Sequence, residues 1–356
     1  MMLLVLVHHS VFWHVLFILT TKRFLRTNII IYFETTVGGK NMPTFALFWF
    51  EWGSNEYISR MKVGTSQATA LDFKLRGFDY LVALDGEGKR SRYTGDGYND
   101  GKQLARFLES LLGNMEYYVT IPFYRFDSNI PRDSVKGNFD GSYWQKWIDG
   151  VVDSAGNNLK GFYWSLEASG QFTYGYGDGR VSRYLIEGMS YYVRKDYGLD
   201  FIWIPSLGGR TVSDLEKYTD IKSYHGYFDY VFCQPNYYQR QFMSDGTSYS
   251  YLNLLDIFQW IRGIDYPKVS IELEADRGVL GIHCSDNRDC PTGTSCDGGY
   301  CHENCRALNP VPCIDYACDY VNAQYDTLGE LWTNRAYYFS TDLKVIDAVR
   351  NRCVKW

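Results

Sequence analysis

A (β/α)8 barrel of the α/β class is the fold that this sequence predicts. From residue 44 onward, short aromatic and β-branched runs alternate with longer helical stretches, as expected of βα units with a parallel sheet. Without its first 41 residues and a cysteine-rich stretch, the chain is close to the roughly 250 residues typical of such barrels. A doubly wound open sheet is the alternative, but no G-x-G-x-x-G or G-x-x-x-x-G-K-[ST] fingerprint follows any run.

The expected elements alternate along the chain. Seven strands have a clear sequence pattern and an eighth has a weak one. We expect them at 45–52, 80–84, 117–123, 161–167, 201–205, 230–235, 269–274 and about 336–340. Helices are expected between them, among others at 101–112, 142–152, 181–197, 211–218 and 250–262.

The first 41 residues are expected to be separate from the barrel of residues 42–356. Residues 1–20 are nearly all apolar and Lys22, Arg23 and Arg26 follow them, which suits a membrane anchor or an uncleaved signal, with membrane contact through residues 1–41 alone. A cleavable secretory signal fits less well, because no A-x-A site follows and three histidines interrupt the run. Alternatively, codons for residues 38–42 (GGKNM) can contain a ribosome-binding site before an AUG, so that Met42 is the true start.

The composition argues against nucleic-acid binding and favours an aromatic surface or cleft. Lys+Arg 36 against Asp+Glu 41 gives a net charge of −5, so the basic footprint of a nucleic-acid-binding protein is missing. Aromatic residues make up 17% of the chain, more than an ordinary core needs, so we expect rings to line a surface or cleft.

Seven of the nine cysteines lie between Cys284 and Cys318, within an expected insertion at 279–318 after the seventh strand. No C-x-x-C pair is present, which favours disulfides over zinc, and we expect at least three bonds within this stretch, with the seventh cysteine free or joined to Cys353. Disulfides favour an extracytoplasmic location, although the cytosol of hyperthermophiles is an exception, so localisation stays open. The insertion lies on the rim that carries active-site loops, either as a wall of the cleft or as a stapled decoration.

Two strands end in Leu-Glu-Ala. Glu167 ends the fourth strand, and Glu272 and Glu274 share one face of the seventh. Function in such barrels collects at the C-terminal strand ends, and two carboxylates across the mouth suit acid/base chemistry on a glycosidic bond. The competing interpretation is structural: Arg125, Arg180 or Arg277 form ion pairs with these glutamates.

This arrangement resembles that of the retaining barrel glycosidases, with an acid/base on strand four and a nucleophile on strand seven. The resemblance implies Glu167 as acid/base and Glu274, or else Glu272, as nucleophile. Leu166 stands where many of those enzymes carry Asn, which puts the usual contact to the sugar 2-hydroxyl in doubt. More closely, GFYWSLEA, FCQPNYY and SIELEAD resemble domain of unknown function 4855, a barrel-type family suspected of acting on carbohydrate; the likeness spans about 44–353 apart from the cysteine loop.

Further strand-end residues suit a sugar-binding cleft, because amides can bind vicinal hydroxyls and rings can stack on sugars. The substrate-binding candidates are Trp49, Glu51, Tyr124, Arg125, Tyr163, Trp203, Gln234, Asn236 and Tyr237. No H-x-H or H-E-x-x-H occurs, so neither a metal nor another cofactor is expected. The sequence therefore predicts a glycosidase with a carbohydrate substrate; a non-catalytic carbohydrate-binding or cell-surface barrel is the alternative.

Overall fold

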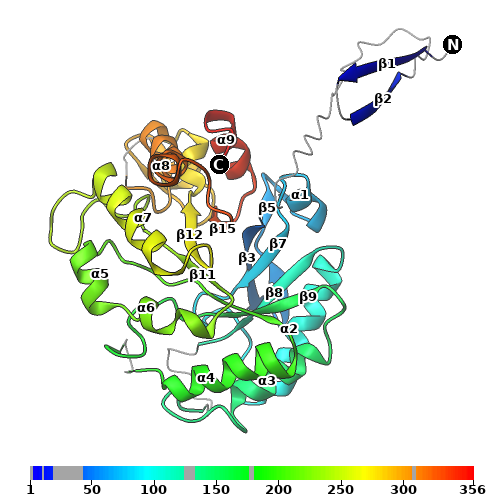
Figure 1. Cartoon of the computed structure of the whole chain (residues 1–356), viewed down its shortest axis with the longest axis vertical. Helices are drawn as coiled ribbons and strands as arrows, with labels where there is room; N and C mark the ends of the chain where they lie inside the picture. Colours follow the sequence, from blue (N-terminus) through cyan, green and yellow to red (C-terminus); the bar gives the residue numbers. More distant parts are fainter. Residues whose placement is uncertain (1–2, 10–11, 19–42, 124–132, 176–179, 307–309) are drawn as a thin grey trace. The chain divides into compact units, whose positions relative to one another are not determined.

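Eight parallel strands form a closed ring in the computed structural model of the chain, which describes residues 3–9, 12–18, 43–123, 133–175, 180–306 and 310–356 (Figure 1). The strands are β3 (Thr44–Gly53), β7 (Tyr80–Leu84), β8 (Glu116–Ile121), β9 (Leu159–Trp164), β10 (Asp200–Trp203), β11 (Tyr230–Cys233), β12 (Val269–Glu274) and β15 (Arg335–Tyr338). Each pairs with the next, and β15 pairs with β3. The predicted (β/α)8 barrel is confirmed.

The N-terminal segment forms a unit of its own, residues 1–40. It contains an antiparallel hairpin of β1 (Leu3–His9) and β2 (Phe12–Ile18). No helix in the described part of the chain is both long and apolar enough to cross a membrane.

Helices follow the strands and lie outside the ring (Figure 1). The α-helices are α1 (Ala70–Lys74), α2 (Gly97–Leu112), α3 (Tyr143–Val152), α4 (Arg183–Tyr191), α5 (Val212–Tyr218), α6 (Ile221–Tyr224), α7 (Tyr251–Asp265), α8 (Pro310–Leu328) and α9 (Lys344–Arg352). Side-chain caps fix several starts: Ser142 accepts from the Gln145 N–H and Ser250 from that of Asn253, which satisfies amides that the first turn leaves free. The predicted helix 181–197 ends instead as a π-helix, η1 (Tyr192–Asp196).

Short elements decorate the barrel. They are β4 (Glu56–Ser59), β5 (Lys62–Val63), β6 (Ser66–Gln67), β13 (Ser295–Asp297) and β14 (Tyr300–His302), with the 3-10 turns η2 (His225–Tyr227), η3 (Arg277–Leu280) and η4 (Asn287–Asp289). The first three follow β3, and the last two strands lie in the cysteine-rich insertion.

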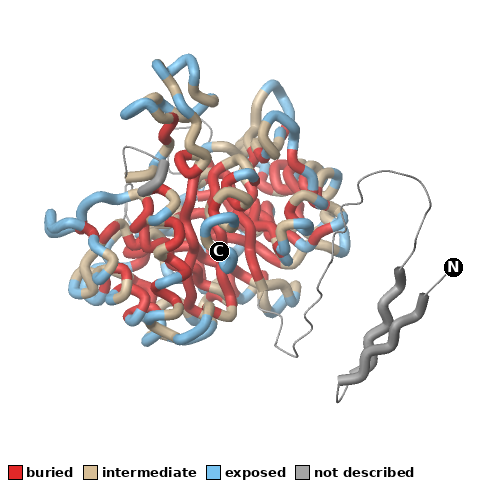
Figure 2. The backbone as a smooth tube through the Cα atoms, turned by 90° about the horizontal axis from the view of Figure 1, so that it is seen from above, coloured by how far each residue is buried: buried red, intermediate tan, exposed pale blue. Residues whose placement is uncertain are grey.

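Strand residues alternate between two cores, as a period of two requires. One core fills the barrel and includes Phe45, Leu47, Val82, Leu84, Tyr118, Tyr163, Ile202, Ile204, Phe232 and Ala336. The other lies between strands and helices and includes Phe48, Trp164, Trp203, Ile271 and Leu273. Buried segments accordingly occupy the middle of the barrel unit, and exposed ones its edge (Figure 2). Residues 270, 272 and 274 thus alternate with helix-facing neighbours and point to the barrel side.

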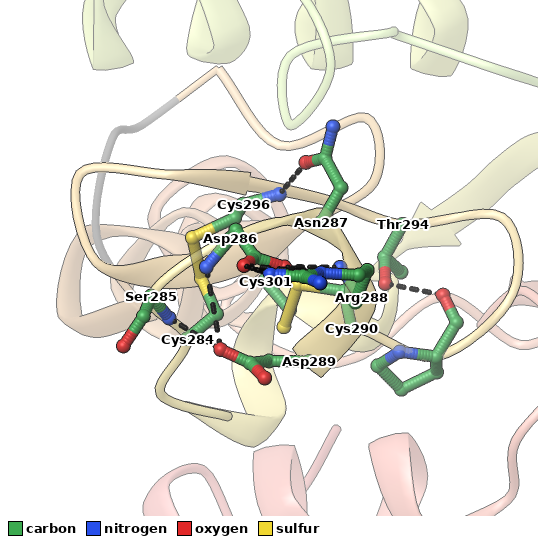
Figure 3. Close-up of a disulfide and its surroundings, with 11 residues drawn as sticks. Cys284, Ser285, Asp286, Asn287, Arg288, Asp289, Cys290, Thr294, Cys296 and Cys301 are labelled. Atoms are coloured by element: carbon green, nitrogen blue, oxygen red, sulfur yellow. Dashed lines mark hydrogen bonds and ion pairs between the residues drawn. A yellow bond between two sulfur atoms is a disulfide. The ribbon is translucent and has the colours of Figure 1, made fainter.

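The cysteine-rich insertion is stapled by disulfides. Within it, Cys284 bonds to Cys296, Cys290 to Cys301 and Cys305 to Cys313 (the first two pairs in Figure 3). Cys318 bonds to Cys353, which ties α8 to the end of α9. The prediction of at least three internal bonds, with the seventh cysteine free or joined to Cys353, is confirmed. The last residues of the range expected for the insertion, 279–318, belong to α8, which begins at Pro310 and packs against α7 and β12.

Candidate active site

Glu167 lies three residues beyond the end of β9, at the C-terminal mouth of the barrel. Its part-buried position raises the pKa of the carboxyl to about 7, and the nearby Glu87 carboxylate acts in the same direction. A hydrogen bond from Gln234 opposes the shift. The Glu167 backbone N–H donates to Glu87 Oε1 at 3.4 Å. Glu167 is thus a carboxylic acid that can gain or lose a proton near neutral pH.

The two β12 glutamates differ in their partners. Glu274 is fully buried; its Oε1 accepts from Asn236 Nδ2 at 3.2 Å and its Oε2 accepts from the Tyr320 hydroxyl of α8. Burial raises the pKa of Glu274 to about 8, although the Tyr320 hydroxyl and the backbone N–H groups of Asn236 and Tyr238 lower it. Burial, with Glu274 and Glu167 nearby, raises the pKa of Glu272 well above its usual value. Among the residues that the structure describes, Glu272 Oε2 has no hydrogen-bond partner.

Hydrogen bonds to a carboxylate favour its charged form. Of the neighbouring pair, Glu274 has the donors and Glu272 lacks a partner for one oxygen. When the pair shares one proton, we therefore place the proton on Glu272 and the charge on Glu274.

Strand tilt decides which β12 residue lies level with Glu167. Across β11 and β10, Val269 is in register with Trp164 of β9. In the other direction, through β15, β3, β7 and β8, Leu273 is in register with Leu159. The register thus slips by about eight residues around the ring, as in other barrels of this type. Because the slip accumulates evenly from strand to strand, Glu274 lies nearer the level of Glu167. Glu272 lies about one inward-facing position deeper in the barrel.

Sequence reasoning missed several groups around Glu167. Asp85 and Glu87 follow β7 in the run LDGEG, and a search of every strand end for carboxylates would have found them. Asp85 is fully buried; burial raises its pKa to about 6, while Gly88 N–H and Ser91 Oγ donate to it. Tyr338, at the end of β15, has a pKa raised well above its usual value by burial and by nearby carboxylates that include Glu272 and Glu167. The mouth is therefore strongly acidic.

Arg277, one of the arginines expected as partners for these glutamates, binds elsewhere. Arg277 forms a two-pronged pair with Glu303, at 3.2 Å from each nitrogen, and its Nη1 donates to the Thr292 carbonyl. Arg180 is exposed, and Arg125 lies outside the described residues. Between described residues, no ion pair involves Glu167, Glu272 or Glu274.

Metal-ligand geometry is found at one place in the described ranges. The sulfurs of Cys284, Cys290 and Cys301 lie within 4.8 Å of one another, but all three cysteines are in disulfides and are not free to coordinate an ion.

Trp49 and Glu51 lie in β3, toward its C-terminal end. The guanidinium groups of Arg60 and Arg90 lie 5.9 Å and 5.7 Å from the Trp49 ring centroid. Both arginines also pair with Glu51 Oε2, at 3.5 Å and 2.6 Å. Glu51 is thus neutralised by cations, so the role expected for its carboxylate in sugar binding needs these pairs to open.

Other expected cleft residues are occupied by structural contacts. The sugar-stacking role expected for Trp203 is wrong. The Trp203 side chain faces the helices, is fully buried and donates from Nε1 to the Leu166 carbonyl, so its ring cannot stack on a sugar. Tyr237 is likewise buried on the helix side, where its hydroxyl donates to Asp319. Asn236 uses its carbonyl oxygen on Ser206 and Gly208 and its amide on Glu274, which corrects the expectation that it binds sugar hydroxyls.

The remaining expected residues divide into two groups. Gln234 donates to the Ile204 carbonyl and to Glu167, and Tyr163 is buried inside the barrel close enough for Glu167 to raise its pKa. Both lie at Glu167 and contribute to its surroundings. Tyr124 lies outside the described residues, as Arg125 does.

Comparison with known proteins places the chain in a family. Residues 154–251 match Domain of unknown function (DUF4855), a stretch that includes β9, Glu167 and the FCQPNYY run. The uncharacterized protein MJ0957 of Methanocaldococcus jannaschii is 30% identical over 362 residues, covering 86% of this chain and 91% of that protein. The chain belongs to the DUF4855 family. The resemblance drawn from its short motifs is thereby confirmed.

Solved structures similar to this DUF4855 member include two chitinases and a glucosidase. The Ostrinia furnacalis Group IV chitinase is 11% identical (87% of this chain, 99% of that chain, TM-score 0.43), and a GH18 chitinase from Pseudoalteromonas aurantia is 10% identical (87% and 99%, TM-score 0.44). A family 1 β-glucosidase from Thermotoga maritima is 9% identical (76% and 75%, TM-score 0.42). At these values the activity has to be argued from the chain's own residues.

Proposed function

We propose that this protein is a glycoside hydrolase that cleaves an oligo- or polysaccharide by a two-carboxylate mechanism. The observation that carries the proposal is Glu167, a carboxyl at the end of the fourth barrel strand with a pKa raised to about 7 and a β12 glutamate near its level. A carboxylic acid that is protonated near neutral pH can donate its proton to a leaving glycosidic oxygen.

In the retaining form of the mechanism, Glu274 attacks the anomeric carbon while Glu167 protonates the leaving oxygen and the glycosidic bond breaks. The resulting ester between Glu274 and the sugar is then hydrolysed by water, whose proton returns to Glu167. The donors on Glu274 support its ionised form, and Glu272, one inward position deeper, supports the site as a neutral neighbour. A retaining enzyme needs the two reacting carboxyls about 5 to 5.5 Å apart and an inverting one about 6.5 to 9.5 Å.

A second candidate is a non-catalytic barrel that binds carbohydrate. It is favoured by the burial of the β12 glutamates, since Glu272 is 2% exposed and Glu274 is 0% exposed. In that case sugars bind at the mouth and are not cleaved.

Chemical rescue tests the catalytic proposal. The purified protein is first screened on a polysaccharide panel, and Glu274→Ala is then assayed on an activated aryl glycoside with azide or formate. We expect Glu274→Ala to abolish hydrolysis and the small anion to restore part of it, because it replaces the missing nucleophile. Glu272→Ala is the matched control and should lose activity without rescue.

Two results contradict this assignment in different ways. Rescue confined to Glu272→Ala would move the nucleophile one inward position deeper. Sugar binding without cleavage on any substrate, with both variants binding as the parent does, would establish the non-catalytic barrel.

A further inference from the structure

A cavity of about 870 Å³ opens on the C-terminal rim beside the proposed active site. Three segments line it: the turn after β3, η3 with the cysteine-rich insertion, and the turn between β15 and α9. Because β15 lies between β12 and β3 in the barrel, these segments are neighbours on one sector of the rim. Glu51 reaches the cavity from the strand that also carries Trp49, and Arg277 reaches it three residues after Glu274.

Positive charge dominates this cavity, although the whole chain carries −5. Its cations are Arg60, Lys62, Arg277 and Lys344, and its anions are Glu51 and Asp342. The carboxylates are already engaged: Glu51 pairs with Arg60 and Arg90, and Asp342 Oδ1 accepts from the backbone N–H groups of Gly64 and Lys344 at 3.0 Å each.

Two of the cations have no partner of their own. The ammonium groups of Lys62 and Lys344 make no hydrogen bond or ion pair within the described part of the chain, and both side chains are exposed. Lys344 Nζ lies over Gly64, where a Cβ would stand only 2.7 Å away, so the glycine leaves room for the ammonium. Backbone at φ +65° also favours glycine there.

Apolar side chains complete the lining. Ile58, Leu280, Ile282 and Pro291 contribute to the wall between the cations. A free inorganic ion would use neither this apolar surface nor this volume, whereas a sugar ring presents an apolar face together with its substituents. The insertion wall is held in place by the Cys290–Cys301 bond and by the Arg277 contacts to Thr292 and Glu303.

We infer that this cavity is a subsite for an anionic sugar unit, one that carries a carboxylate or sulfate group, of the chain whose bond is cleaved at Glu167. The cleavage step of this inference rests on the proposed function, whereas the binding of an anionic sugar to the cavity does not. Lys62 and Lys344 bind the anionic group, and the disulfide-stapled insertion forms one wall of the subsite. The substrate class is then an acidic polysaccharide.

Binding to an inactive variant tests the subsite apart from hydrolysis. In the Glu167→Ala background, calorimetry compares a hexameric oligogalacturonate with a neutral cello-oligosaccharide of the same length. We expect tighter binding of the acidic oligomer that weakens as salt is raised. Lys62→Ala with Lys344→Ala should weaken it at least tenfold, whereas Lys146→Ala with Lys195→Ala, which removes two exposed lysines from α3 and η1, should change it less than twofold.

Three outcomes would overturn the subsite. They are equal affinity for the acidic and neutral oligomers, equal effects of the two double variants, and competition by inorganic sulfate at the affinity of the oligomer itself. A protein that binds the acidic oligomer in this way but hydrolyses nothing retains the subsite and loses the proposed reaction.

Discussion

At the scale of single residues, the mouth of this barrel concentrates carboxylates that burial shifts toward their neutral form, while Lys89 acts in the opposite direction at Glu167. Glu167, Glu272, Glu274 and Asp85 all have raised pKa values, and in each case burial is the main cause. Carboxylates buried in this way weaken the folded state, and such sites are where acid/base chemistry is commonly found. Buried carboxyls with raised pKa values therefore support a catalytic role for the mouth more strongly than carboxylates in charge-neutral ion pairs would.

The pH dependence of activity follows from Glu167. Glu167 must hold its proton to assist the leaving group, and its pKa is raised to about 7. Glu274 must at the same time be ionised, and its pKa is raised to about 8, so the gain in ionised Glu274 offsets the loss of the Glu167 proton between about pH 7 and 8. We therefore expect kcat/KM to fall about tenfold per pH unit above about pH 8. In Glu167→Gln, assayed on an aryl glycoside that needs no proton, this alkaline limb should disappear.

Glu116→Gln is the control, because Glu116 is exposed at the opposite end of the barrel, where β8 begins. It should keep the limb. An alkaline limb that survives in Glu167→Gln would show that another group is the acid.

At the scale of elements, close packing of α2 against α3 supports the wall of the barrel. Glycines make this approach possible: a Cβ on Gly150 would lie 2.0 Å from the Tyr98 carbonyl oxygen, and one on Gly101 would lie 2.3 Å from that of Trp147. Trp147 in turn donates from Nε1 to the Thr120 carbonyl of β8. The helix pair is thus fixed to a strand that ends at the mouth.

A substitution at this contact should be costly. We expect Gly150→Ala to lower the free energy of unfolding by about 2 kcal/mol or more, because the clash is with backbone and the helices must separate. Gly263→Ala in α7 is the matched control: nothing lies within 4 Å of its Cβ, so it should be neutral or stabilising by up to about 1 kcal/mol. Urea unfolding measures both, and equal effects at the two sites would refute the packing argument.

At the scale of the whole molecule, the buried acids couple stability to pH. Their folded-state pKa values lie above the ordinary value of 4.5 for glutamate, so the folded state holds protons that the unfolded state releases. Stability must therefore fall as pH rises from about 4.5 through the folded-state pKa values of Glu167, about 7, and Glu274, about 8.

Unfolding by urea at pH 5 and pH 8 measures this coupling. We expect a lower free energy of unfolding at pH 8, and we expect Glu272→Gln to reduce the difference between the two pH values, because a neutral amide has no proton to lose. Stability that is flat or rises over this range would show that the acids are not buried as described.

The sequence by itself determined the barrel and the side of its strands on which the glutamates lie. The period-two pattern placed Glu167, Glu272 and Glu274 on the barrel side of their strands, and the clustering of cysteines predicted a stapled insertion. These are local properties, because strand alternation and strand ends can be recognised from a few consecutive residues.

Only the tertiary structure decided the rest, because it depends on contacts between distant residues. One donor to Glu274 is Tyr320, 46 residues away on an outer helix, and no local pattern marks it. Trp203 is expected at a sugar-binding cleft, yet its ring is fully buried in the core between strands and helices, where its Nε1 donates to the carbonyl of Leu166, 37 residues away. The basic cavity exists because three rim segments meet when β15 closes the ring between β12 and β3, and ring closure is a property of the whole chain.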